Sequence, residues 1–350
     1  MTDASDRGLP PSLPLDLRRG LTDAGDTAFP LRWGILGAGS ISTQWVEALA
    51  ACPGATVTAV AARDRARAEQ FAARFGIAAA YGDYAAMVAS PEVDIVYVGT
   101  VNSVHKEHTL LAVAAGKHVL CEKPLAESAA DARAMYAAAE AQGVMLQDAV
   151  WTRFFPAVEH ARTLIEDGAI GQVSLLQSDF FDPIYAVQAA PLAFGAEARP
   201  TAIGVAGRNV RGAVVEYGPD RCAMLTFPAR VSEFPEVTEI AGSRGRITLH
   251  RPAHSPSRMS VRQAAEDQIP SLYATANVPL PVQAFEYPLP GTFAMQRPHP
   301  NQHGFLYQAE AVHRCLAAGL RECPQYGKQE SLPAMDLLTS IASLFREQDD

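Results

Sequence analysis

The fold of this chain is decided by the stretch Leu31-Arg32-Trp33-Gly34-Ile35-Leu36-Gly37-Ala38-Gly39-Ser40-Ile41-Ser42. Its first half is an apolar run that predicts a short strand, and the run passes directly into the G-x-G of Gly37 and Gly39. The first glycine permits a tight turn, the second lets the backbone approach a pyrophosphate, and the helix that Ser40 can begin offers N–H donors. Such glycines are common at turns for conformational reasons alone. Their place between a first strand and a helix nevertheless predicts a dinucleotide-binding loop.

Beyond this loop, strands and helices continue to alternate up to about residue 150. The alternation, with its short connections, predicts a parallel sheet with helices on both faces and right-handed crossovers. We therefore expect a Rossmann-type domain over residues 31–150. Its expected strands are 31–36, 55–62, 93–98, 117–121 and 144–147, and its expected helices are 40–51, 65–75, 104–115 and 127–142.

The pattern changes after Trp151. Runs of strands without intervening helices predict an antiparallel sheet. The predicted fold class is therefore α/β, with an N-terminal Rossmann-type parallel sheet and a C-terminal α+β domain, residues 151–350, that carries an open antiparallel sheet. In this domain the expected strands are 173–180, 203–209, 213–217, 222–227, 237–241 and 246–250, the expected helices are 157–167, 302–318 and 331–346, and the proline-rich residues 251–300 are expected to form long loops with short strands.

The amino-acid composition excludes several classes of function for this chain. The chain has 350 residues, of which 48% are hydrophobic and 19% charged, so it has enough apolar material for a packed core. The net charge is −9 and no run of Lys and Arg occurs, so we expect no nucleic-acid partner. Residues 1–30 are rich in Asp, Gly and Pro and contain no apolar signal segment, which predicts a disordered tail.

The cysteines and the hydropathy of the chain indicate the cellular compartment in which we expect the protein. The five cysteines form no C-x-x-C pair, and no apolar run reaches the length of a membrane span. We therefore expect neither a disulfide framework nor a membrane partner, and a reducing compartment. A cytoplasmic protein is the simplest interpretation.

The residues at the end of the second expected strand indicate whether the domain prefers NAD or NADP. NAD enzymes usually place Asp or Glu there, on the ribose hydroxyls, whereas this chain has Arg63, with Arg67 one helical turn further on. A planar guanidinium can pair with a 2′-phosphate and stack on adenine, so the pattern favours NADP over NAD. The alternative is that both arginines are solvated helix charges and that Asp64 binds the ribose.

A lysine follows the strand expected at 117–121, in the sequence Glu122-Lys123-Pro124. The carboxyl ends of the strands form the edge at which open α/β sheets bind their ligands. A partly desolvated lysine there has a lowered pKa and can exchange protons near neutrality. The alternative is an ordinary surface lysine. The position beside a dinucleotide loop favours a functional role for Lys123.

The loop after the strand expected at 93–98 reaches the same edge. Thr100 and Asn102 could contact the nicotinamide ribose or amide, although Asn102 or Ser103 could equally be an ordinary helix N-cap. His105 and His108 have His-x-x-His spacing but no evident third ligand, so no metal site is expected.

Together these residues resemble the Gfo/Idh/MocA oxidoreductase family, most of all the branch of the dimeric dihydrodiol dehydrogenases and the NADP-dependent xylose dehydrogenases. The resemblance extends from residue 31 to about residue 345, and its Glu-Lys-Pro and Trp-Thr-Arg-Phe-Phe-Pro motifs are specific in combination. It is carried by Trp33–Gly39, Ala61–Asp64, Ala80–Gly82, Ala115–Pro124 and Trp151–Pro156, with weaker matches in Gly168–Gly171, Ala241–Gly245 and Gly304–Tyr307.

The resemblance implies hydride transfer between C4 of a nicotinamide and the hydroxyl or hemiacetal carbon of a sugar or a trans-dihydrodiol. It also implies that Lys123 is the catalytic lysine, that Trp151 and Phe180 line the substrate cleft, and that the second sheet forms a homodimer interface. From the sequence alone, the two aromatic residues could equally be plain core residues. The candidate cofactor-binding residues are Gly37, Gly39, Ser40, Ile41, Arg63, Arg67, Thr100, Asn102, His105, Glu122 and Lys123.

The sequence departs from the family pattern after Phe180. The branch normally has a loop, a Gly-rich turn and a helix that begins Asp-x-Gly-x-Tyr, whose Asp and Tyr lie in the active site. Tyr185 aligns with that Tyr and is the second candidate catalytic residue. Asp182, a candidate substrate-binding residue, either stands for the helix Asp or belongs to an earlier Phe-Asp-Pro of the loop. The sequence therefore predicts an NADP-dependent oxidoreductase, with a catalytically impaired dinucleotide-binding paralogue as the alternative.

Overall fold

The computed structural model describes residues 29–264, 280–290, 293–295 and 299–349 of the chain. They form two compact units. The first contains residues 29–154 together with Pro290–Lys328, and the second contains Phe155–Leu289 and the chain from Gln329 onward. The tail expected over residues 1–30 lies outside the described residues, except for Phe29 and Pro30.

The first unit is built on a six-stranded sheet of order β3-β2-β1-β4-β5-β6, in which all neighbours are parallel, as the alternation of elements predicts. The order turns back between β1 and β4, and this switch point is where α/β sheets bind ligands. The strands are β1 (Leu31–Leu36), β2 (Ala55–Ala61), β3 (Ala79–Tyr81), β4 (Ile95–Val98), β5 (His118–Cys121) and β6 (Leu146–Asp148).

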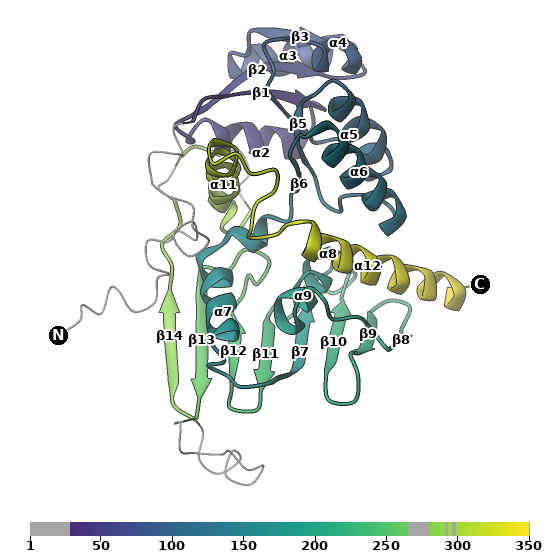
Figure 1. Cartoon of the computed structure of the whole chain (residues 1–350), viewed down its shortest axis with the longest axis vertical. Coiled ribbons are helices and arrows are strands. Elements are labelled where there is room, and N and C mark those ends of the chain that lie inside the picture. Colours follow the sequence, from purple (N-terminus) through teal and green to yellow (C-terminus); the bar gives the residue numbers. More distant parts are fainter. Residues whose placement is uncertain (1–28, 265–279, 291–292, 296–298, 350) are drawn as a thin grey trace, which may run out of the picture. The chain divides into compact units, whose positions relative to one another are not determined.

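The helices of this unit follow the strands in turn, and α5 and α6 pack against each other (Figure 1). β3 and α4 were not anticipated, because elements of three and five residues are too short to show a hydrophobic period. The helices are α2 (Ser40–Leu49), α3 (Arg65–Phe75), α4 (Tyr84–Val88), α5 (His105–Ala114) and α6 (Ala129–Gln142).

Local signals set the helix ends of this unit. Asp64 and Ser128 cap α3 and α6 by accepting hydrogen bonds from backbone N–H groups of the first turn. The same two helices end at Gly76 and Gly143, which both adopt the left-handed conformation that glycine favours.

Three aromatic side chains, Trp33, Trp45 and Tyr97, form the centre of the core of the first unit. Each is at most 1% exposed. The Trp45 ring stacks on Tyr97 with centroids 5.1 Å apart and meets Trp33 edge-on at 5.5 Å. This packing holds α2 against β1 and β4, and so it positions the turn between β1 and α2.

Helix α11 (Phe305–Ala317) belongs to the first unit, although the change of pattern after Trp151 predicts residues 302–318 to lie in the second domain. It packs against α2 (Figure 1). The Trp33 indole N–H points at Nε2 of His313, 3.2 Å away, and the Phe305 ring lies 6.1 Å from that of Trp45. The apolar side of α11 completes the core of this unit, which no local pattern in the sequence reveals.

The second unit carries an eight-stranded sheet of order β14-β13-β12-β11-β7-β10-β9-β8. The expected antiparallel sheet is in fact mixed, because β10 runs parallel to β7. The chain leaves β7 through two helices and a hairpin before it returns at β10, and such a long crossover permits parallel pairing. The strands are β7 (Val173–Asp179), β8 (Ala202–Ala206), β9 (Arg211–Glu216), β10 (Cys222–Phe227), β11 (Thr238–Gly242), β12 (Gly245–Leu249), β13 (Arg258–Gln263) and β14 (Val282–Glu286).

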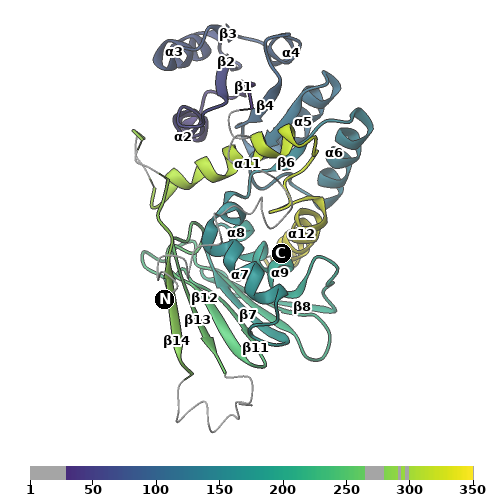
Figure 2. The same cartoon turned by 60° about the vertical axis from the view of Figure 1, so that its left-hand side comes forward.

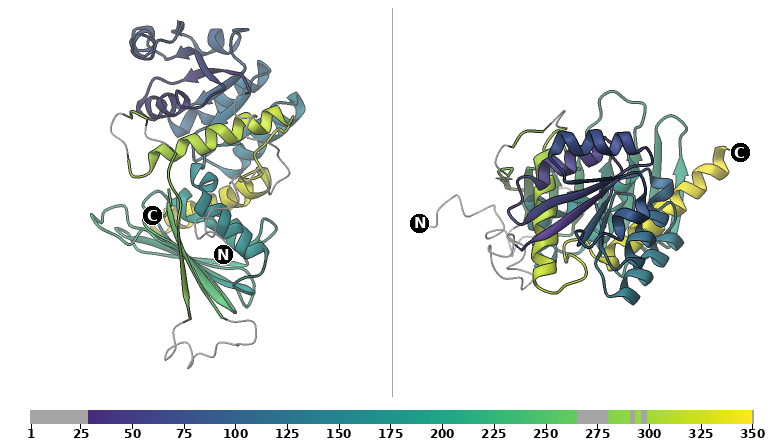
Figure 3. Two further views of the ribbon diagram at one scale, coloured as in Figure 1. Left: turned by 90° about the vertical axis from the view of Figure 1, so that its left-hand side faces the viewer. Right: turned by 90° about the horizontal axis from the view of Figure 1, so that it is seen from above.

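Helices of the second unit lie on one face of this sheet, and the other face carries none of the described helices (Figures 2 and 3). The burial of β10 alternates accordingly: Ala223, Leu225 and Phe227 point to the helices, while Met224 and Thr226 are exposed. Across the described residues, no helix combines the length and the apolarity that crossing a membrane requires. The helices of this unit are α7 (Pro156–Glu166), α8 (Pro183–Val187), α9 (Ala189–Phe194) and α12 (Lys328–Asp349).

Candidate active site

The turn between β1 and α2 has the geometry of a phosphate-binding loop. Gly37 has φ +102°, and a Cβ there would lie 2.8 Å from the carbonyl oxygen of Gly99, so no other residue fits. A Cβ on Gly39 would meet no atom within 4 Å, so the protein leaves space beside this backbone. Contrary to the prediction from the sequence, Ser40 does not cap α2; it is the first residue of the helix, before Ile41, and Gly39 holds the cap position. No side chain caps α2, so its first N–H groups remain for a ligand in this space. The loop therefore fits an anionic group such as a pyrophosphate.

Ser42 stands at the last position of the G-x-G-x-x-G pattern that begins at Gly37, where glycine is usual, and it packs against the neighbouring loop. A Cβ on Gly99 would lie 2.4 Å from the Ser42 Oγ atom, so both residues must be small for α2 to approach β4 this closely. Ser42 is completely buried.

Both candidate NADP-selecting arginines are exposed and lie beside the loop. Arg63 follows β2, and Nη2 of Arg67 lies 3.4 Å from the carbonyl oxygen of Ala38. Asp64, the alternative ribose ligand, has its Oδ1 engaged by the N–H of Ala66 at 2.9 Å as the cap of α3. Both guanidinium groups are therefore exposed close to the carboxyl end of β2.

His105 was expected among the cofactor-binding residues, but its ring is completely buried. Its Nδ1 lies 2.9 Å from the carbonyl oxygen of Pro124, and its Nε2 lies 3.2 Å from that of Thr100. The ring thus joins the loops that follow β4 and β5. We interpret His105 as a positioning residue, because its side chain is turned into the protein rather than toward a ligand.

The loop that follows β4 holds Thr100 and Asn102, and His108 lies on α5, which comes after it. The Thr100 hydroxyl lies 3.0 Å from Nδ1 of His108, and burial lowers the pKa of that histidine. Asn102 is exposed and begins the short 3₁₀ helix Asn102–Val104. Neither this helix nor α5 has a side-chain cap, so the N-cap alternative for Asn102 or Ser103 is wrong. Across the described residues, no group of three or more His, Cys, Asp or Glu is arranged to hold a metal ion.

Glu122 and Lys123 follow β5 directly, and the core holds Glu122 in place. The Tyr97 hydroxyl donates to Oε1 of Glu122 at 2.7 Å, and the backbone N–H of Lys123 donates to Oε2 at 3.1 Å. Burial raises the pKa of this carboxyl group, although Lys123 and the Tyr97 bond oppose the rise. These two hydrogen bonds fix the residue before Lys123, so the half-buried lysine is held in place at the carboxyl edge of the sheet. Tyr97 was not anticipated, because a tyrosine in an apolar strand is indistinguishable from a core residue.

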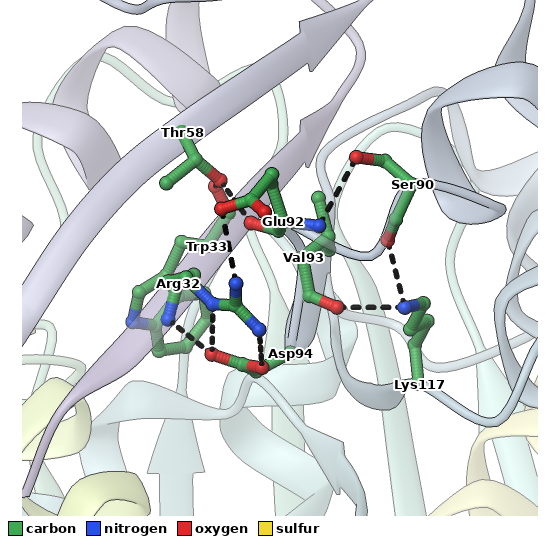
Figure 4. A network of polar contacts seen from close by, with 8 residues as sticks. All are labelled: Arg32, Trp33, Thr58, Ser90, Glu92, Val93, Asp94 and Lys117. Atoms are coloured by element: carbon green, nitrogen blue, oxygen red, sulfur yellow. Dashed lines mark hydrogen bonds and ion pairs between the residues drawn. The ribbon is translucent and has the colours of Figure 1, made fainter.

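At the opposite edge of the same sheet, charged side chains form contacts that stabilise the fold (Figure 4). Arg32 forms hydrogen bonds to both carboxyl oxygens of Asp94, at 2.7 and 3.0 Å, and lowers its pKa. Lys117 Nζ donates to the carbonyl oxygens of Ser90 and Val93 at 2.9 and 2.7 Å. Arg32 and Lys117 thus both bind the loop that precedes β4, and we assign them a structural role. Lys123 remains the candidate functional lysine of this sheet.

Trp151 belongs to the first unit, while Phe180, Asp182 and Tyr185 belong to the second. The Trp151 ring meets Phe305 edge-on at 4.4 Å and is 5% exposed. Its surroundings are therefore largely those of a core aromatic residue.

In the second unit, the segment after β7 brings two predicted residues together. The Phe180 ring meets that of Tyr185 edge-on, with centroids 4.9 Å apart. Asp182 is the N-cap residue of α8, and Pro183 occupies the first helical turn, where its missing N–H costs nothing. Tyr185 lies in the first turn of α8 and is buried to 8% exposure. Only residues 180–182 connect β7 to α8, and this short connection places Phe180 against Tyr185.

His254, which no pattern in the sequence indicates, lies in the same cluster. The His254 ring lies 4.7 Å from Phe180 and 5.4 Å from Tyr185, centroid to centroid. Its Nδ1 lies 2.5 Å from Oε1 of Glu236. Glu236 is held in turn, because its backbone N–H donates to the Asp179 carboxylate at 2.5 Å. The only signal in the sequence is a histidine in a proline-rich loop, which by itself predicts nothing.

Comparisons with known proteins agree with the fold described above. Residues 31–149 match the model of the Gfo/Idh/MocA oxidoreductase family with an NAD-binding Rossmann fold. The chain is 31% identical to trans-1,2-dihydrobenzene-1,2-diol dehydrogenase of Sus scrofa over 345 residues, which cover 89% of this chain and 96% of the relative. A levoglucosan dehydrogenase in complex with NADH and levoglucosan superposes with a TM-score of 0.75 at 19% identity, covering 91% and 98% of the two chains. A 3-ketoreductase from Actinomadura kijaniata, in complex with TDP-benzene and NADP, superposes with a TM-score of 0.68 at 22% identity, covering 91% and 97%.

Proposed function

Because the chain belongs to the Gfo/Idh/MocA oxidoreductase family and is an NAD(P)-dependent dehydrogenase, we propose that it transfers hydride between NADP and a sugar or trans-dihydrodiol. The observation that carries the proposal is the Tyr97–Glu122 hydrogen bond at 2.7 Å, which fixes the residue preceding Lys123 at the ligand-binding edge of the sheet. The names of the relatives support the substrate class: a dihydrodiol dehydrogenase by sequence and a levoglucosan dehydrogenase by fold.

In the proposed reaction the chain's own residues bind, orient and move a proton. The loop at Gly39 and the N-terminus of α2 bind the pyrophosphate, and Arg63 and Arg67 bind the 2′-phosphate. The bound nicotinamide supplies the hydride acceptor or donor. Lys123 Nζ, in its neutral form, takes the proton of the substrate hydroxyl and returns it in the reverse direction. Tyr185 holds the same hydroxyl through its own phenol.

The apolar rings support the recognition of a flat or cyclic substrate. Phe180 and Trp151 offer aromatic faces of the kind that line sugar and diol sites. Asp182, half-buried at the start of α8, offers a carboxylate that a second hydroxyl group can donate to.

The alternative is a dinucleotide-binding protein with little turnover. The observation that favours it is the three-residue connection between β7 and α8, which leaves no room for the loop and Gly-rich turn of the branch. Against it stands the ordered cluster of Phe180, Tyr185 and His254, which a segment without function would not need.

Steady-state assays over a panel of aldoses and trans-dihydrodiols with NADP decide between the two. We expect NADPH formation with at least one substrate. The Lys123→Arg variant should lose about 10²–10⁴-fold in kcat, because a guanidinium cannot give up its proton. Lys106→Arg, at an exposed lysine paired with Asp131, is the control and should keep full activity. Tight NADP binding without NADPH formation from any substrate would establish the alternative.

We also propose that the open face of the second sheet forms a homodimer. Val214 and Met224, which are 48% and 45% exposed, pair with each other across β9 and β10, and Val282 on β14 is 48% exposed. Light scattering should give twice the mass of one chain, and Met224→Arg should give a monomer, whereas Val231→Arg in the loop after β10 should not. The five cysteines are all free thiols, which supports a cytoplasmic location.

A further inference from the structure

A cavity lies within the second unit, between α8, α12 and the turn that connects β8 to β9. Its volume is about 480 Å³, within the range of small-molecule sites. Its floor is apolar: Phe227 and Phe345 lie with ring centroids 6.3 Å apart, and Leu338 and Ile341 extend the same surface along α12.

The rim of this cavity is cationic, in a chain whose net charge is −9. Four arginines line it: Arg208, Arg211, Arg230 and Arg346. Arg211 is engaged, because it pairs with Asp349 and its guanidinium lies 4.8 Å above the Phe345 ring. The other three are exposed and have no ion pair within the part of the chain that the structure describes.

The cavity is separated from the candidate active-site cluster by one pair of rings. Phe181, which lines the cavity, stacks on Phe180 with centroids 4.6 Å apart, and Phe180 in turn contacts Tyr185. Phe181 is 54% exposed among the described residues, which is unusual for a phenyl ring. A ligand with an apolar body would bury it.

We propose that this cavity binds a small organic anion, an aryl or short alkyl body that carries one carboxylate, sulfate or phosphate head. The body packs on Phe227, Phe345 and Phe181, and the head pairs with the guanidinium groups of Arg230 and Arg346. An inorganic anion leaves the apolar floor uncovered, and a neutral aromatic compound leaves the arginines unpaired. The site therefore selects ligands that carry both features.

Isothermal titration calorimetry on the full chain tests the proposal, with benzoate, hexanoate and benzyl phosphate as probes. Acetate and inorganic phosphate are the controls that lack an apolar body. We expect the three probes to bind at least about tenfold more tightly than the controls, a difference of about 1.4 kcal/mol. Whichever of benzoate and benzyl phosphate binds more tightly identifies the preferred head group.

Variants locate the binding. Arg230→Gln and Arg346→Gln should each weaken benzoate at least about tenfold, because each removes a charge-assisted hydrogen bond. Arg199→Gln, at an exposed arginine outside the cavity, should not weaken it. Ala342→Trp fills the cavity from α12 without a change of charge and should abolish binding. Equal affinity in Arg230→Gln, Arg346→Gln and Arg199→Gln would overturn the proposal.

Binding in the candidate active site would also contradict it. Lys123→Met removes the cation of that site, so benzoate affinity should be unchanged in this variant if the cavity at α12 is the binding site. A loss of binding in Lys123→Met would place the anion elsewhere and overturn the proposal. Because no turnover is measured, these outcomes are independent of whether the chain oxidises a sugar or a diol.

Discussion

The hydroxyl group of Tyr97 on β4 donates a 2.7 Å hydrogen bond to Oε1 of Glu122, directly after β5. The bond joins the fully buried Trp45–Tyr97 stack to the residue that precedes Lys123. Through it, the core of the first unit determines where the candidate catalytic lysine stands.

Removing this hydroxyl group should weaken both folding and catalysis. Tyr97→Phe leaves a buried carboxyl oxygen without its donor, which costs about 1–3 kcal/mol of unfolding free energy. Urea denaturation measures the loss, and kcat should fall while the Kd for NADP stays within about twofold, a difference under 0.5 kcal/mol. Tyr81→Phe, at a half-buried tyrosine of β3, is the matched control and should be neutral in both measurements. An unchanged kcat in Tyr97→Phe would contradict the positioning role.

The raised pKa of Glu122 predicts how stability depends on pH. A carboxyl group whose pKa is higher in the folded than in the unfolded state binds more protons when folded. Its contribution to stability is therefore lost as the pH rises from the ordinary value of 4.5 through the folded pKa. Glu122→Gln should flatten this decrease in a series of urea titrations. The same slope in both proteins would show that Glu122 does not titrate in this way.

Asp94 should act with the opposite sign. Arg32 lowers the pKa of Asp94, so this carboxylate stabilises the fold above its ordinary pKa of 3.8 and loses that effect as the pH falls through the lowered value. Asp94→Asn should lower the urea midpoint at pH 7, and the difference from the parent chain should shrink in acid. Glu92→Gln removes the exposed partner of the same arginine and should have a smaller effect at pH 7.

The cofactor preference can be tested at the end of β2. Arg63→Ala should weaken NADP by about 10- to 100-fold, the cost of a lost charge-assisted contact, and should leave NAD nearly unchanged. Fluorescence titration with both dinucleotides measures the ratio. Arg65→Ala, at an exposed arginine that pairs with Glu69 on the same helix, is the control. Equal losses for NADP and NAD in Arg63→Ala would refute the 2′-phosphate assignment.

His254 should matter for the substrate and not for the cofactor. Its ring is oriented by Glu236 at 2.5 Å and lies against Tyr185, so Glu236→Gln should lower kcat/KM by about tenfold, as loss of an orienting partner typically does. NADP affinity should not change. His250→Asn, at a histidine that bonds Ser260 on the same stretch of chain, is the matched control. A normal kcat/KM in Glu236→Gln would remove His254 from the site.

Much of the first sheet is readable from local sequence. The apolar runs of β1, β4 and β5 are bounded by residues that favour one particular backbone conformation, such as Gly37 at φ +102°. Cys222–Phe227 was predicted with its observed bounds, because its alternation of buried and exposed residues is strict. The parallel pairing of that strand with β7 was not predicted, because the alternation along a strand is the same whichever way its neighbour runs.

By itself, the sequence determined the Rossmann half, the phosphate-binding loop and the family, because these depend on short motifs and on periods that each segment carries alone. Only the tertiary structure decided that α11 completes the first unit, that Tyr97 supports Glu122, and that His254 stands against Tyr185. Each of these depends on side chains from separate segments meeting across a packed core. Packing selects such partners by shape and by unsatisfied hydrogen-bonding groups, and neither property is written in the local pattern of the residues that meet.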